Sequence, residues 1–164
     1  MKRITSCLLA IILCLGLFCF PVSAATREGV LDCTAFSSDQ SGEGWSWSQS
    51  TKTLSLNGLE ISSDADGIRL PGGSYLQLSG ANSVHADGTG VLVDGFLFIK
   101  GDGSLDIVSD GVGLQGSILS LQGGAPLIRI QSQGVGVITG GKLSISDGAI
   151  HSGNGVHIGI EIEN

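Results

Sequence analysis

The chain has 164 residues with 27 glycines, and its 15 acidic residues outnumber its 8 lysines and arginines, which gives a net charge of −7. This balance argues against nucleic acid and anionic membrane surfaces as partners. Hydrophobic residues make up 41% of the chain, which argues against a disordered linker and for a folded domain.

Residues 1–24 are typical of a signal peptide. Two basic residues precede an apolar run over residues 8–20, and small residues at positions 22–24 suit a signal peptidase. The apolar run is too short to be a convincing membrane span. We therefore expect a secreted protein at the cell exterior, with no membrane insertion after cleavage. Cys33 is then its one cysteine, so no internal disulfide is expected.

Residues 25–41 are expected to form a lead-in or cap segment, and residues 42–164 a repetitive domain. Six glycines recur at spacings of 21 or 23 residues: Gly44, Gly67, Gly88, Gly111, Gly134 and Gly155. Mostly apolar residues stand one and three positions after each glycine, as in a strand with one buried face. On this alignment Trp45 and Trp47 share the inward columns of Ile68 and Leu70, a column being one set of equivalent positions in successive repeats. We expect the two tryptophans to close one end of the core; the alternative is a sugar-stacking platform on the outside.

Two further runs of alternating apolar residues follow in each repeat, as in Leu54 with Leu56 and Leu59 with Ile61. A parallel β-helix explains this pattern better than a sandwich, which gives no reason for equivalent positions to match at this spacing. The sequence therefore predicts an all-β solenoid with three short strands per rung, about 21–23 residues per rung and roughly six rungs. The charged residues 161–164 either cap the solenoid or mark a chain truncated at its C-terminus.

Three stretches carry a family resemblance: GWSWSQSTKTLSLNGLEI, DGIRLPGGSYLQLSGANSV and LFIKGDGSLDIVSDGVG. They resemble a family of exported bacterial carbohydrate-binding domains, and the similarity covers residues 44 to about 160. The resemblance implies a right-handed parallel β-helix that binds plant cell-wall polysaccharides such as pectin and cellulose and carries calcium ions. An aspartate usually follows the second tryptophan in this family, whereas Ser48 stands there in this chain.

The aspartates that precede the repeat glycines are candidate calcium ligands. On the glycine alignment Asp66, Asp87 and Asp110 would stack on neighbouring rungs, and Asp64 lies close enough to contribute. Stacked carboxylates repel one another, and a hard divalent cation with oxygen ligands would remove that cost. The alternative is that aspartate precedes glycine here because turns favour that pair.

Aromatic residues are candidates for carbohydrate binding. If Leu97 and Ile99 point inward, then Phe96 and Phe98 point outward, and Tyr75 would stack one rung from Phe96. Sugars dock their C–H faces on such rings, and outward apolar residues require an explanation in a secreted acidic protein. The alternative is that a loop or residues 25–41, with Phe36, fold over these rings.

Two glycines extend the candidate binding surface. Gly90 and Gly113 belong to a column that the alignment places outward, where missing side chains would leave a groove for a linear chain. Alternatively, glycine is simply tolerated on the surface of a solenoid. Asp106 and Arg129 stand 23 residues apart in another outward column and are expected to form a surface salt bridge.

The favoured function is non-catalytic binding of extracellular polysaccharide of the cell-wall type, with calcium as a candidate cofactor. The alternative is a structural or adhesive solenoid that binds a protein partner. A polysaccharide lyase or glycosidase is a weaker third reading, because it rests on fold analogy alone. A glycosidase needs two carboxylates that face each other across a cleft, and no such constellation is visible in the sequence.

Overall fold

The computed structural model describes residues 24–146, 148–152 and 160–162, and almost all of its regular structure is β-strand. The strands are β1 (Ala25–Glu28), β2 (Leu31–Asp32), β3 (Gln40–Gly42), β4 (Trp45–Ser48), β5 (Thr53–Asn57), β6 (Leu59–Ser63), β7 (Ile68–Leu70), β8 (Ser74–Ser79), β9 (Ala81–Ala86), β10 (Val91–Val93), β11 (Phe96–Gly101), β12 (Ser104–Ser109), β13 (Leu114–Leu121), β14 (Leu127–Ser132), β15 (Val137–Ile145), β16 (Ala149–Ser152) and β17 (Ile160–Ile162). A short 3-10 turn, η1 (Cys33–Ala35), follows β2.

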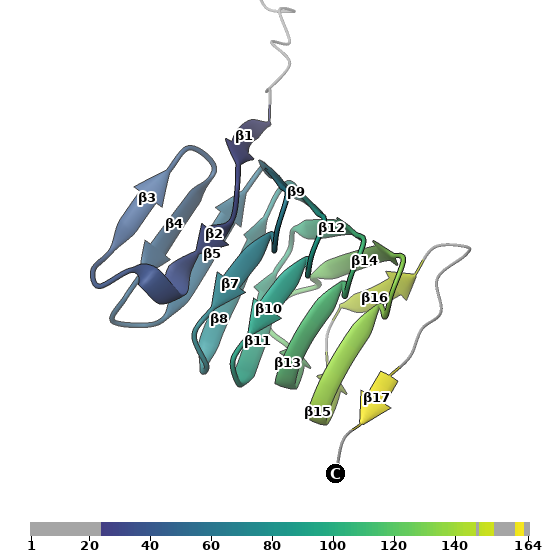
Figure 1. Ribbon diagram of the computed structural model, residues 1–164. Coiled ribbons are helices and arrows are strands. Elements are labelled where there is room, and N and C mark those ends of the chain that lie inside the picture. The colour runs from purple at the N-terminus through teal and green to yellow at the C-terminus, as the bar shows by residue number, and fades with distance from the viewer. Residues whose placement is uncertain (1–23, 147, 153–159, 163–164) are drawn as a thin grey trace, which may run out of the picture.

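The strands wind into a parallel β-helix with three sides, which confirms the predicted fold (Figure 1). The first side stacks β1, β6, β9, β12, β14 and β16 in that order. The second side stacks β2, β7, β10 and the first halves of β13 and β15, with β17 beyond them. The third side stacks β5, β8, β11 and the second halves of β13 and β15.

The solenoid has fewer complete turns than the six repeats suggest. The uninterrupted turns run over β6–β8, β9–β11, β12–β13 and β14–β15, about four in all. The opening rung is built from β1, β2 and β5, and the inserted strands β3 and β4 interrupt it. The sixth repeat glycine, Gly155, and the predicted signal peptide up to residue 23 lie outside the described residues.

The true repeat differs from the glycine alignment in the rung of Gly67. Ile68 pairs with Val91 and Val91 pairs with Leu114, a uniform step of 23 residues. Gly67 therefore stacks on Gly90 and not on Gly88, so the predicted spacing of 21 to the next rung is wrong. The dipeptide Asp-Gly occurs in two different columns of the turn, so a match on this dipeptide places Gly67 in the wrong column.

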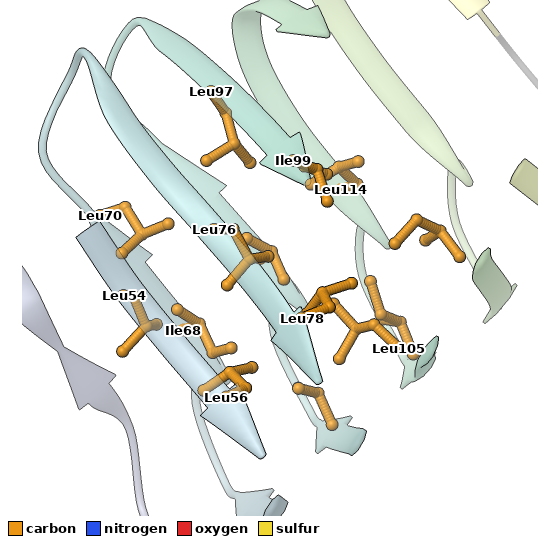
Figure 2. Packing of buried hydrophobic residues seen from close by; sticks show 14 of the residues in the cluster. Leu54, Leu56, Ile68, Leu70, Leu76, Leu78, Leu97, Ile99, Leu105 and Leu114 are labelled. Carbon is orange, nitrogen blue, oxygen red and sulfur yellow. The ribbon is translucent and has the colours of Figure 1, made fainter. Parts of the chain in front are cut away.

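Leucine and isoleucine ladders fill the solenoid. Leu54, Leu76 and Leu97 come from successive rungs of the third side and point to the interior (Figure 2). All three side chains are fully buried, and burial of such a side chain stabilises the fold by about 1.5–3 kcal/mol. The buried amide of Asn82 is satisfied, because it accepts from the Leu59 N–H and donates to two backbone carbonyls.

An antiparallel hairpin closes the N-terminal end of the third side. β4 lies between β3 and β5 (Figure 1) and pairs antiparallel with both. Trp45 and Trp47 therefore lie opposite Leu56 and Leu54. The predicted inward column with Ile68 is therefore wrong, because Leu31 of β2 pairs with that residue. Trp47 is nonetheless buried and closes the core, and its Nε1 donates to Gln49 Oε1 over 2.8 Å.

Residues 25–41 are more than a lead-in, because β1 and β2 belong to the solenoid sheets themselves. Phe36 packs against half-buried Trp45, with ring centroids 5.9 Å apart. The Arg27 guanidinium lies 5.3 Å from the centroid of the same indole. The lead-in and the hairpin thus form one cap around Trp45. Among the described residues, no helix is long and apolar enough to cross a membrane.

Candidate functional site

The outer surface of the third side is the candidate site. Its strands alternate buried apolar residues with outward ones, as in β8, where Leu76 and Leu78 are buried between Tyr75 and Gln77. We call this surface the aromatic face. Its outward residues on β5, β8, β11 and β13 are Thr53, Ser55, Tyr75, Gln77, Phe96, Phe98, Lys100, Ile118 and Ser120.

Three aromatic rings lie on this face, as the sequence predicted. Tyr75 stacks on Phe98, with centroids 5.1 Å apart and planes 25° apart, because the two residues pair across β8 and β11. The predicted stacking partner, Phe96, instead lies opposite Ile118 of β13 and is 49% exposed. The Tyr75–Phe98 stack covers one face of each ring, so Phe96 is the most open ring of the three.

The cap segment does not cover these rings. The aromatic residue expected to do so, Phe36, packs against Trp45 on the hairpin. The exposed fraction of Phe96 therefore reflects an open surface within the described part of the chain.

The aromatic face is the side of the solenoid without negative charge. The strand segments that form it, together with β3 and β4, contain no aspartate or glutamate. Lys100 lies on β11 of this face, with Nζ 5.0 Å from the ring centroid of Tyr75. Lys52 precedes β5 and donates through Nζ to the Gly72 carbonyl over 3.0 Å. In a chain with a net charge of −7, this side offers lysines and no carboxylates on its strands.

Gly90 and Gly113 do not form the predicted groove, because both are buried and face inward. A Cβ on Gly90 would lie 2.2 Å from Ile107 Cγ2, and one on Gly113 would lie 2.3 Å from Ile130 Cγ2. These glycines let the chain turn the corner between the first and second sides against the side chain of the next rung. Their role is in packing.

The acidic column exists with a corrected membership. Backbone bonds from Asp87 to Ser63 and from Asp110 to Ala86 place Asp64, Asp87 and Asp110 at equivalent positions of successive rungs. Asp66 lies in another column, where its Oδ1 accepts the Thr89 N–H and its Oδ2 pairs with Arg69.

The predicted calcium ligands do not converge in the structure. Asp110 accepts a hydrogen bond from Gln133, and the Asp66 hydrogen bond raises the pKa of Arg69. Among the described residues, no group of three or more His, Cys, Asp or Glu side chains could hold a metal ion. Calcium binding therefore stays a prediction from the sequence, with no built site to carry it.

The first side carries the predicted ion pair. Arg129 NH1 lies 3.0 Å from Asp106 Oδ1, and both side chains are about half exposed, so the pair adds little stability. A shallow hollow of about 390 Å³ surrounds the pair and extends to His151. Cys33 is buried at the N-terminal cap, and burial raises the pKa of its thiol to about 12.

The structure adds site residues that sequence reasoning missed. The hairpin carries a hollow of about 450 Å³ lined by Asp39, Gln40, Ser41, Ser46, Trp47, Ser48, Thr51, Thr53 and Ser55. Most of these side chains are polar, and Thr53 and Ser55 also belong to the aromatic face. The alternation of serine with tryptophan and leucine in WSWS and TLSLN was the available signal, but it revealed only the buried partners.

Comparison of the chain with protein-family models, with curated proteins and with solved structures finds no match.

Proposed function

We propose that this protein binds an extracellular polysaccharide, without catalysis, on the aromatic face. The observation that carries the proposal is one surface that combines outward aromatic rings, lysine, amide and hydroxyl groups on a sheet. Aromatic rings offer apolar area to the C–H faces of sugars, whereas Gln77 and the serines offer hydrogen bonds to sugar hydroxyls. Exposed aromatic residues on a secreted acidic protein favour a binding role over a passive surface.

The charge distribution favours an acidic polysaccharide over a neutral one. Acidic residues lie on the first side, as in Glu60 and Asp106, and in the turn column of Asp64 and Asp87. A polyanion would be repelled by those surfaces and would meet Lys100 on the third side, whose strands contain no carboxylate. Polygalacturonate is therefore the first probe for the proposed activity.

Binding without turnover agrees with the composition of the same face. Hydrolysis of a glycosidic bond uses a pair of carboxyl groups that flank the scissile bond. The strands of the aromatic face supply none, so a sugar bound there would meet no such pair from these strands.

Affinity electrophoresis through gels that contain polygalacturonate, xylan or soluble cellulose derivatives tests the proposal. We expect polygalacturonate to retard the protein, and we expect Phe98→Ala or Lys100→Ala to weaken the affinity roughly tenfold. Val108→Ala is the matched control, because Val108 is 38% exposed on the first side and lies outside the aromatic face. Failure of every glycan to retard the native protein would reject the proposed function.

An adhesive solenoid that binds a protein partner is the second candidate. The observation in its favour is β3, whose three residues are exposed and which pairs with β4 along one edge only among the described strands. A free strand edge can pair with another chain. Sedimentation at increasing concentration would show self-association if this edge is used, and a constant monomer mass would exclude pairing between copies.

A further inference from the structure

The outward residues of the third side form two rows that run across the strands. The register pairs Ser41 with Ser46, Ser46 with Ser55, Ser55 with Gln77, and Gln77 with Lys100. We call this set the polar row. It crosses β3, β4, β5, β8 and β11, so it spans four strand spacings, or about 19 Å along the solenoid axis.

A second row runs beside the polar row. The register pairs Ser48 with Thr53, Thr53 with Tyr75, Tyr75 with Phe98, and Phe98 with Ser120. We call this set the aromatic row. Four strands, β4, β5, β8 and β11, therefore present one member of each row, and the two rows lie side by side over these strands.

The hollow in the hairpin lies at the N-terminal end of both rows. Its lining includes Ser41, Ser46 and Ser55 of the polar row and Ser48 and Thr53 of the aromatic row. In the part of the chain that the structure describes, the hydroxyls of Ser41, Ser46 and Ser55 make no hydrogen bond. These hydroxyls are free to bond a ligand, and buried Trp47 forms part of the lining.

A linear ligand could lie on this face in two directions, along a strand or across the strands. A ligand along a strand would reach only two or three outward residues before the turn, as in β5, where Thr53 and Ser55 are the half-exposed pair that faces outward. A ligand across the strands would meet one residue of each row on β4, β5, β8 and β11. Contacts with the ligand therefore accumulate along the solenoid axis.

We propose that the polysaccharide lies along the solenoid axis over both rows, with the hairpin hollow as a subsite for one end of the bound segment. This inference rests on the proposed function and makes Ser46, Ser55 and Gln77 specificity-determining residues. The strands that carry both rows contain no carboxylate, and Lys100 at the end of the polar row suits an acidic chain. The one carboxylate that lines the hollow, Asp39, accepts a hydrogen bond from the Gln49 N–H.

Isothermal titration calorimetry with oligogalacturonates, from the disaccharide to the octasaccharide, tests the orientation. We expect the affinity of the native protein to rise with chain length until the ligand fills the rows. The double variant Ser46→Ala/Ser55→Ala should weaken binding of the longest oligomer roughly tenfold, because two hydrogen bonds are lost. Ser83→Ala, on the outer surface of β9 on the first side, is the matched control and should bind normally. Thermal melting of each variant verifies folding.

The outcomes separate this inference from the proposed function. If the native protein binds neither polygalacturonate nor any oligomer, both are overturned. If it binds, but the affinity stops rising at the disaccharide and the double variant binds normally, the axial orientation and the hollow are overturned while the aromatic face remains. Weaker binding by the double variant alone, together with a rising length series, supports the inference.

Discussion

One methyl group decides whether the rungs can stack at the corner between the first and second sides. A Cβ added to any of three glycines would clash with a branched side chain of the next rung. These glycines are Gly67, Gly90 and Gly113, and they occupy equivalent positions in successive rungs. Their φ angles are not positive, so the requirement for glycine comes from space and not from backbone conformation. This column of glycines is therefore explained by close packing between rungs, which a pattern of hydrophobic residues does not reveal.

Substitution of Gly113 by alanine tests this explanation. The new Cβ would lie 2.6 Å from the Gly136 carbonyl oxygen as well as against Ile130, so one or more rungs must shift. We expect Gly113→Ala to lower the free energy of unfolding by about 1–3 kcal/mol in urea titrations. Gly140→Ala is the control, because no atom lies within 4 Å of its added Cβ and its φ is not positive. Equal stability of the two variants would contradict the packing role.

The turn between the first and second sides is the element in which charge opposes stacking. Asp64, Asp87 and Asp110 recur there at the rung spacing of about 4.8 Å, and all three are exposed. Like charges at neighbouring positions destabilise a stacked structure, although solvent screens them. The central residue, Asp87, experiences repulsion from both neighbours.

Asp87→Asn distinguishes a repulsive column from a calcium site. Because Asp87 lies between two like charges, we expect the substitution to raise Tm by roughly 2 °C at low salt. The gain should shrink as ionic strength increases. Melting curves with calcium and with chelator complete the test, and we expect no difference between them. A Tm that rises with calcium, and that Asp87→Asn lowers, would establish the metal site that the sequence predicted.

At the scale of the whole molecule, the sides of the solenoid differ in charge. The stability of each strand depends on its position along the solenoid axis. Each rung contacts its neighbours on either side, so a central rung is held at two interfaces and a terminal strand at one. β9 and β12 are held between neighbours, whereas β3 pairs only with β4 among the described strands. The hairpin that we propose as a ligand subsite therefore lies at the end expected to open first.

Hydrogen exchange measured by mass spectrometry tests this gradient. We expect amides of β9 and β12 to be the most protected, and amides of β3 to exchange at least tenfold faster than those central strands. Saturating polygalacturonate should slow exchange in β3 and β4, because the ligand binds only the closed hairpin. Uniform protection along the chain, unchanged by ligand, would contradict a position-dependent stability and the involvement of the hairpin.

The fold was predictable from the sequence because it depends on a local alternation that repeats. Leu54 with Leu56 and Leu97 with Ile99 each mark a strand with one buried face, and repetition at about 23 residues stacks such strands. The ion pair of Asp106 and Arg129 followed from the same spacing and is confirmed. The outward placement of Tyr75, Phe96 and Phe98 followed from strand alternation alone.

Register and strand direction were decided only by the tertiary structure. The dipeptide Asp-Gly satisfies turns in two columns, so Gly67 could be assigned to its rung only from backbone pairing with the next rung. Trp45 and Trp47 show the alternation of any one-sided strand, which is the same whether the neighbour is parallel or antiparallel. The hydroxyl-lined hollow was not predicted for the same reason: serines on three successive strands become one surface only when the hairpin folds back beside β5.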